Sequence, residues 1–155
     1  MDIYIKILDF NQYQIVVMRV LYLHAKEFMY KPSKVVKGVP KDSTSMEERY
    51  FRDVLVLLVT IEEGDWKNRD NISNMLIEDL KIHINRISVK NVIIYPYAHL
   101  SDNLEEPNKA YRLLRYLENK MKDIGLQVHR APFGWYKEFS IHIYGHPLAE
   151  LSRRF

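Results

Sequence analysis

The segment from Asp53 to Glu62 reads DVLVLLVTIE, and it decides the fold. Its apolar, mostly β-branched residues run on without alternating, which is typical of a short strand buried on both faces. The stretch Asn91–Tyr95, NVIIY, has the same character and is stopped by Pro96. The sequence therefore predicts two buried strands in the middle of a sheet that is covered on both sides.

Two helical patterns accompany these strands. Apolar residues recur at helical spacing over Ile72–Ser88, with Asp70 or Asn71 as the candidate N-cap. After the second strand, a longer apolar stripe runs from Pro107, a natural first helical residue, to Gly125, a natural stop. Strand–helix–strand units in one sheet predict an α/β fold, a mixed β-sheet with two main helices packed on it.

Further strands are expected on either side of this unit. They are Arg19–His24, Phe28–Val36, Leu126–Arg130 and Phe139–Tyr144. The first two are predicted to pair with each other, the second at a sheet edge because it contains Pro32. The segment between the last two, Ala131–Lys137, is predicted to be a loop. Residues 1–17 alternate in polarity and are expected to form an N-terminal β extension ahead of a domain at residues 18–155.

Composition narrows the class of protein. A chain of 155 residues, 47% of them apolar and 28% charged, fits one globular domain and not a disordered chain. The net charge of +3 permits an RNA partner without requiring one. The absence of cysteine excludes disulfides, cysteine-ligated metals and a thiol nucleophile. The longest apolar run, Val54–Val59, is too short to span a membrane, so a soluble cytoplasmic protein is expected.

Common cofactor motifs are missing. No two of the five glycines have the spacing of a dinucleotide-binding or phosphate-binding loop. His142 and His146 lie four residues apart, but that spacing makes one face only on a helix, and this stretch reads as a strand followed by a loop. We therefore expect neither a metal nor a cofactor.

Three unusual stretches remain, each rich in proline, glycine or aromatic residues. They are YPYAHLS at 95–101, APFGWYK at 131–137 and GHPLAELSR at 145–153. In the plainest interpretation the aromatic side chains cover sheet ends, Lys137 is a solvated charge, and Glu150 pairs with Arg153 on a terminal helical turn. Aromatic side chains beside a lysine also suit unpaired RNA, because an aromatic ring can stack on a base and a lysine can bind a phosphate.

In this order and spacing, these stretches resemble the N-terminal editing domain of archaeal threonyl-tRNA synthetases, whose fold is similar to that of D-aminoacyl-tRNA deacylases. The resemblance covers residues 18–155. It implies proofreading hydrolysis of mischarged L-seryl-tRNA(Thr) by a water molecule, assisted by the terminal 2′-OH of the tRNA and by Lys137. Direct attack by water also agrees with the lack of a cysteine nucleophile.

The resemblance implies a set of site residues. The catalytic candidates are Lys137, Glu150, Tyr136 and His99. The candidates for substrate binding are Thr60, Ile61, Glu62, Tyr95, Pro96, Ala98 and Phe133. The types suit ester hydrolysis, which needs an oriented water, help for the developing oxyanion and a proton for the leaving oxygen.

Other interpretations stay open at this point. The shared fold allows a D-aminoacyl-tRNA deacylase, and loss of catalysis would leave a tRNA-binding module. The expected partners are the 3′ end of tRNA(Thr) carrying serine and a threonyl-tRNA synthetase body, in the same chain or a separate one. A homodimer is expected, and no membrane.

Overall fold

The computed structural model describes residues 18–155, so the predicted N-terminal β extension lies outside the described residues. The elements are β1 (Arg19–Val35), β2 (Arg49–Thr60), α2 (Arg69–Ile87), β3 (Asn91–Pro96), α3 (Pro107–Asp123), β4 (Gln127–Arg130), β5 (Trp135–Ile143) and β6 (Glu150–Arg154). None of the helices in this part of the chain is long and apolar enough to cross a membrane.

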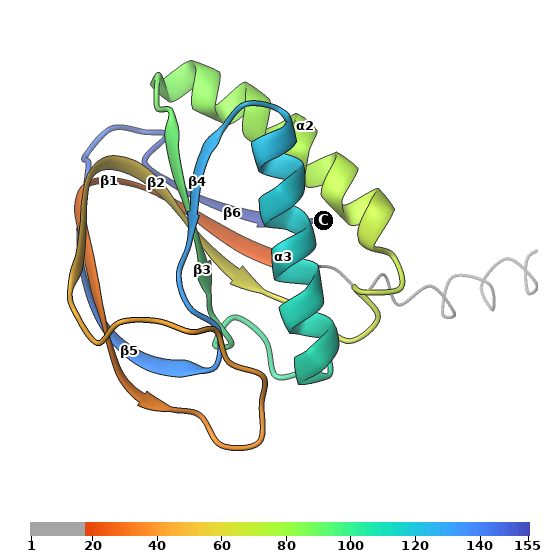
Figure 1. Cartoon of the computed structure of the whole chain (residues 1–155). Coiled ribbons are helices and arrows are strands. Elements are labelled where there is room, and N and C mark those ends of the chain that lie inside the picture. Colours follow the sequence, from red (N-terminus) through yellow and green to blue (C-terminus); the bar gives the residue numbers. More distant parts are fainter. Residues whose placement is uncertain (1–17) are drawn as a thin grey trace, which may run out of the picture.

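The strands form one mixed sheet in the order β4-β3-β2-β1-β5 (Figure 1). β2, β3 and β4 run parallel to one another, which α2 and α3 make possible as crossovers, and β1 is antiparallel to β2. The second edge of β1 is shared, because β6 pairs with Arg19–Leu23 and β5 pairs with Ala25–Val35. The predicted α/β class, with two helices on a mixed sheet, is confirmed.

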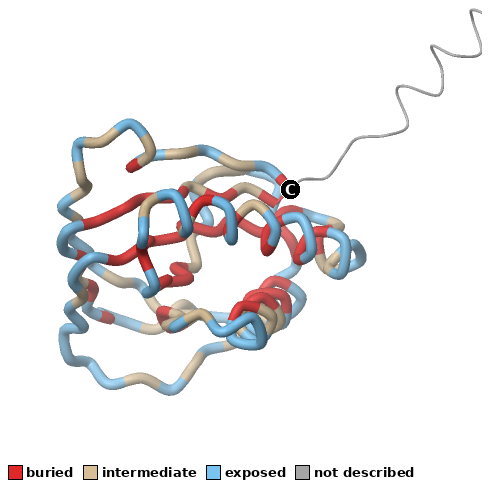
Figure 2. Tube along the Cα trace, turned by 90° about the horizontal axis from the view of Figure 1, so that it is seen from above, coloured by how far each residue is buried: buried red, intermediate tan, exposed pale blue. Residues whose placement is uncertain are grey.

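Burial follows from the continuous apolar character of β2. Leu55, Leu57 and Val59 pack toward α2 and α3, in a cluster completed by both helices. The alternate residues Val54 and Val56 belong to a second cluster on the opposite face, which β1 and β3 extend. The buried residues are concentrated in the central strands and on the inner sides of the helices (Figure 2). The prediction of a strand buried on both faces is confirmed.

The predicted pairing of Arg19–His24 with Phe28–Val36 is wrong, because both stretches belong to the single 17-residue strand β1. Irregularities in its pairing with β5 at Ala25/Glu27 and Pro32/Lys34 bend the strand without ending it. β1 has a partner on both sides as far as Tyr30, which pairs with Arg49 of β2, and beyond that residue it pairs with β5 alone. Pro32 therefore lies where one side of β1 is free, as a strand proline requires.

Three boundaries also differ from the predictions. Helix α2 begins at Arg69 with Asn68 as its N-cap, so Asp70 and Asn71 lie inside its first turn. The predicted loop 131–137 ends earlier, because Trp135, Tyr136 and Lys137 belong to β5. The helical turn considered for Glu150 is strand β6, since the edge of β1 offers it hydrogen-bond partners. Helix α3 does begin at Pro107, and the Glu106 side chain accepts hydrogen bonds from its first turn.

Candidate active site

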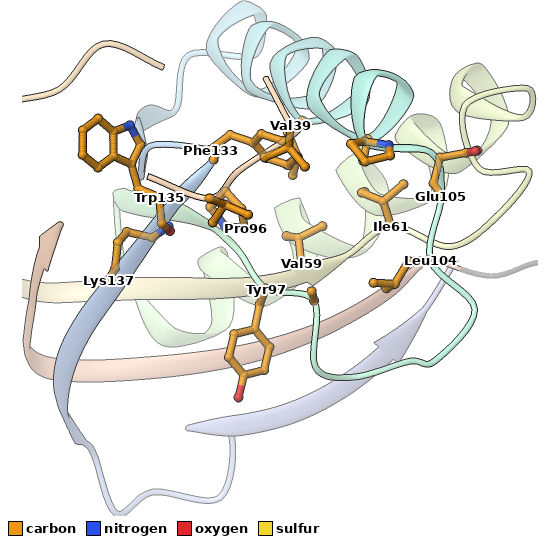
Figure 3. Close-up of a pocket in the computed structure, with 16 residues that line it drawn as sticks. Val39, Val59, Ile61, Pro96, Tyr97, Leu104, Glu105, Phe133, Trp135 and Lys137 are labelled. Carbon is orange, nitrogen blue, oxygen red and sulfur yellow. The ribbon is translucent and has the colours of Figure 1, made fainter. Parts of the chain in front are cut away.

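A cavity of about 350 Å³ opens between the ends of the central strands and the start of α3 (Figure 3). It is mostly apolar. Its lining comes from the loop after β1, the end of β2 and the residue after it, the end of β3 and the segment that follows, the first half of α3, the β4–β5 connection and the start of β5: Val36, Val39, Val59, Ile61, Pro96, Tyr97, Ala98, Leu104, Glu105, Pro107, Ala110, Leu114, Phe133, Gly134, Trp135 and Lys137. Its position, where strand ends and loops converge, is where α/β sheets usually bind ligands.

Lys137 is the only cation that residues 18–155 contribute to that lining. Its Nζ donates to the backbone carbonyls of Pro132 and Trp135, both at 2.9 Å, and lies 5.1 Å from the ring centroid of Tyr95. Burial lowers the pKa of Lys137 to about 8, against a smaller opposing effect of the Asp42 charge. A lysine whose protonation is balanced near neutral pH in an apolar pocket is suited to proton transfer or to oxyanion stabilisation.

Asp42 holds the pocket wall behind Lys137. Its carboxylate accepts hydrogen bonds from Arg130 (2.5 and 3.2 Å), the Tyr111 hydroxyl (2.9 Å) and the backbone N–H of Phe133 (2.8 Å). Its own carbonyl accepts from the indole of Trp135 at 2.8 Å. Burial tends to raise the pKa of Asp42, but these hydrogen bonds outweigh it, and the pKa is lowered. The loop after β1 is thereby fastened to the β4–β5 connection, and the two together form one wall.

The residues expected from the sequence fall into three groups. Ile61, Pro96, Ala98, Phe133 and Lys137 line the cavity. Thr60, Glu62 and Tyr95 are buried outside that lining. His99, Tyr136 and Glu150 are exposed and also outside it.

The buried group has a simple geometric reason. Side chains alternate along a strand, so Val59 and Ile61 face the cavity while Thr60 and Glu62 point elsewhere. The Thr60 hydroxyl donates to the carbonyl of Tyr97, and the Glu62 carboxylate accepts from Arg19 at 2.7 Å. Both side chains support the segments around the cavity.

Several lining residues were not anticipated. Tyr97 and Trp135 stand inside the quoted motifs, so the aromatic composition of those motifs was the signal. No sequence pattern predicts the other part of the lining, because loop residues far apart in sequence form it: Val36, Val39 and Leu104. Glu105, a carboxylate in the lining, accepts from the backbone N–H groups of Gly64, Trp66 and Glu106.

No group of three or more His, Asp or Glu side chains within residues 18–155 has the geometry of a metal site. The cavity itself offers the ammonium group of Lys137, the carboxylate of Glu105 and mostly apolar walls. The fold and this cavity together define an α/β domain with one candidate ligand site among the described residues.

Comparison with known proteins makes this more specific. Residues 18–155 match the family model described as the archaea-specific editing domain of threonyl-tRNA synthetase, and the chain belongs to that family. It is therefore an aminoacyl-tRNA deacylase domain, an ester hydrolase of protein biosynthesis. The family predicted from the motifs is confirmed.

The similar proteins carry two kinds of name, threonine–tRNA ligase and threonine–tRNA ligase editing subunit. A threonine–tRNA ligase of Staphylothermus marinus is 43% identical over 138 residues, which are 88% of this chain and 22% of that protein. Proteins named threonine–tRNA ligase editing subunit, from Saccharolobus solfataricus and Aeropyrum pernix, are 41% and 45% identical over 88% and 89% of this chain. The chain spans 34% and 32% of those two. It thus covers between about a fifth and a third of these relatives.

Proposed function

We propose that this domain proofreads threonine charging by hydrolysing L-seryl-tRNA(Thr). The observation that carries the proposal is Lys137, held at the wall of an apolar cavity in a chain of the editing-domain family. The 3′ end of the tRNA would bring the aminoacyl ester to this cavity. The seryl group is small, so a cavity of about 350 Å³ leaves room for it beside the terminal ribose.

The proposed reaction is direct hydrolysis. A water molecule, oriented by the terminal 2′-OH of the tRNA, attacks the ester carbonyl and gives a tetrahedral oxyanion. The Lys137 ammonium stabilises that charge, and the carbonyls of Pro132 and Trp135 keep it in place. Collapse breaks the bond to the 3′ oxygen, which takes a proton, and releases serine and tRNA.

The exposed candidates have different proposed roles. Glu150 accepts from the substrate's α-ammonium group or from Lys137, and His99 and Tyr136 contact the terminal nucleotide. The three buried candidates have an indirect role, in which they hold the neighbouring lining residues in place: Thr60, Glu62 and Tyr95. Pro96, Ala98 and Phe133 shape the wall against which the acyl group lies.

Serine and threonine differ by one methyl group, which a pocket can distinguish by about 1–3 kcal/mol. Ile61 is the proposed sensor of that methyl group because it lines the cavity directly after the end of β2. A synthetase that cannot reject the smaller serine during activation needs such a second site. On this basis we place the domain beside a threonyl-tRNA synthetase body, in one chain or in trans, in the cytoplasm.

A homodimer is the proposed assembly. β5 ends the strand order and so leaves one edge unpaired within residues 18–155, and Tyr136 and Phe139 on it are 52% and 39% exposed. Unpaired edges with exposed aromatic residues favour pairing with a second copy. Light scattering of the purified chain decides between a monomer and a dimer.

The decisive experiment is deacylation of seryl-tRNA(Thr) and threonyl-tRNA(Thr) by the chain and by Lys137→Met. We expect fast loss of serine, spared threonine, and a rate lowered by about 10²–10⁴-fold in the variant. Lys31→Met, an exposed lysine on the neighbouring strand, is the matched control. Near-normal turnover by a folded Lys137→Met protein would contradict the role of the lysine.

The same assay separates the competing functions. Preferential loss of a D-seryl ester would indicate a D-aminoacyl-tRNA deacylase. Binding of tRNA without hydrolysis of any ester would indicate a binding module.

A further inference from the structure

A chain of hydrogen bonds lies where the partner of β1 changes from β6 to β5. His24 Nδ1 lies 2.8 Å from His146 Nε2, and His24 Nε2 lies 3.0 Å from Asp53 Oδ1. The Tyr144 hydroxyl donates to the same Asp53 oxygen at 3.2 Å. The backbone N–H of Leu148 donates to His146 Nδ1 at 3.2 Å. Three segments therefore meet here: β1 through His24, β2 through Asp53, and the connection at 144–149.

The direction of each bond follows from the fixed donors. Leu148 N–H can only donate, so His146 Nδ1 is bare and its proton is on Nε2. That proton points at His24 Nδ1, and His24 then donates from Nε2 to Asp53. Both nitrogens of both rings are therefore engaged, which fixes the two rings relative to β2 and to the connection at 144–149.

The backbone of His24 also makes hydrogen bonds to the connection at 144–149. Its N–H donates to the carbonyl of Ala149 at 2.8 Å, and its carbonyl accepts from the N–H of Tyr144 at 2.9 Å. These bonds clamp both ends of the connection at 144–149, while the His24 side chain holds its middle through His146. The residue that follows the clamp is Glu150, which pairs with Leu23, the neighbour of His24.

The backbone conformation of Asp53 suits its place in the arrangement. It has a φ of 49° inside a strand, in the left-handed region that aspartate and asparagine adopt more readily than other residues with a Cβ atom. Its carboxylate accepts from both His24 and Tyr144, so one residue of β2 ties β1 to the connection at 144–149.

We propose that His24 is a positioning residue, which acts through the connection at 144–149 to fix the Glu150 carboxylate for ester hydrolysis. The inference rests on the proposed function, because it takes Glu150 to be used in the reaction. Glu150 is exposed and makes no side-chain hydrogen bond within residues 18–155, so its position depends on its backbone alone.

The first test compares substitutions of His24 in the deacylation assay with seryl-tRNA(Thr). His24→Leu removes both ring nitrogens and is expected to lower kcat by about tenfold to a hundredfold, with KM changed by less than about threefold. His24→Asn keeps an acceptor near the position of Nδ1 and is expected to recover part of the loss. His142→Asn is the matched control, because His142 is exposed on β5 and has no side-chain hydrogen bond in the described part.

Asp53 offers an independent variant. Asp53→Asn keeps an acceptor for His24 and tolerates the left-handed conformation, so it is expected to retain most activity. Asp53→Ala loses the acceptor and is expected to behave like His24→Leu. Equal effects of the two Asp53 substitutions would contradict the proposed chain.

A double-mutant cycle separates positioning from a general loss of stability. If His24 acts through Glu150, His24→Leu adds no further loss of kcat once Glu150→Gln is present. If the two losses multiply, or if Glu150→Gln alone leaves kcat unchanged, the inference is wrong. Thermal unfolding confirms that each variant is folded at the assay temperature.

A measurement on the free protein keeps the inference distinct from the proposed function. Ring ¹⁵N shifts report which imidazole nitrogens are protonated, and the backbone amide of Glu150 reports its surroundings. His24→Leu should move the His146 ring signals and the Glu150 amide, whereas His142→Asn should not. Should the wild-type chain hydrolyse no aminoacyl ester, the proposed function fails. Unmoved signals in His24→Leu overturn the positioning role whatever the activity.

Discussion

Two sides of the candidate site are built in opposite ways. On one side, Lys137 has its ammonium fixed by two carbonyls, and Asp42 fastens the wall behind it with four hydrogen bonds. By contrast, three exposed candidates outside the cavity lining, His99, Tyr136 and Glu150, make no side-chain hydrogen bond within residues 18–155, and we propose them as the rim of the site. On that proposal, the chain organises the lysine in advance and leaves the rim to be completed by the RNA.

This difference is what catalysis on a large RNA substrate would require. A charge that stabilises a transition state is most effective when it is fixed and desolvated before the substrate arrives. Groups that contact the terminal nucleotide must be accessible and gain their partners only on binding. If this division is correct, substitutions on the fixed side alter the free energy of unfolding, and substitutions on the rim do not.

The largest effect on stability is expected for Asp42→Ala. It leaves Arg130 with Glu118 alone and removes the acceptor of Phe133 N–H and of the Tyr111 hydroxyl. Breaking such a partly buried pair is expected to lower the free energy of unfolding by about 3 kcal/mol. Urea denaturation measures this loss. Asp102→Ala, at an exposed loop aspartate, is the control, and a similarly small change in both would show that Asp42 does not hold the wall.

Gly134→Ala tests the same wall by close approach. A Cβ at Gly134 would collide with the carbonyl oxygen of Pro40, and its φ of +81° already disfavours alanine. We expect a loss of about 2 kcal/mol in the free energy of unfolding, together with lower deacylase activity.

Gly38→Ala is a matched control for this experiment. Gly38 has a similar φ of +77°, but an added Cβ would meet nothing within 4 Å, so the variant reports backbone strain alone, about 1 kcal/mol. Equal losses in the two variants would mean that the contact between Gly134 and Pro40 is not tight in solution.

The pH dependence of stability measures how far Lys137 is desolvated. Its pKa is about 8 in the folded chain, below the ordinary value of 10.5, so the unfolded chain binds more protons between these values. The free energy of unfolding should therefore rise with pH through this window, by at most about 1.4 kcal/mol per pH unit.

Lys137→Met should abolish that rise, and Lys31→Met should keep it. Urea denaturation at a series of pH values, taken as the difference between wild type and each variant, cancels the titration of the other groups. A wild-type curve parallel to that of Lys137→Met would show that the lysine is solvated. In the deacylation assay, loss of activity above pH 8 would support the ammonium as the active form.

The fold could be predicted wherever one continuous stretch of sequence contains the whole pattern of an element. The continuous apolar run of β2 and the stripe of α3 each determine an element, because burial on two faces or on one face leaves a distinct period. The sequence predicts two strands, Arg19–His24 and Phe28–Val36, the second at a sheet edge because of Pro32, where the structure has the single strand β1. Its continuity depends on β5, which supplies partners where β2 has stopped, and no local pattern contains that information.

The candidate site could be predicted in part. Motifs located the segment around Lys137, and alternation along β2 could have shown that Thr60 and Ile61 cannot face the same wall. The role of Asp42 could not be predicted, because its partners Arg130 and Phe133 lie 88 and 91 residues away in the sequence. The same holds for His24, whose partner His146 is 122 residues away.

The smallest effect on stability is expected on the rim. His99→Gln and Tyr136→Phe remove groups without hydrogen bonds within residues 18–155, so the free energy of unfolding should stay within about 0.5 kcal/mol of wild type. Deacylation of seryl-tRNA(Thr) should nevertheless fall, and more through KM than through kcat, if these groups contact the terminal nucleotide. A loss of stability as large as that of Asp42→Ala would mean that the rim is as preformed as the wall. The RNA would then add the substrate but no part of the site.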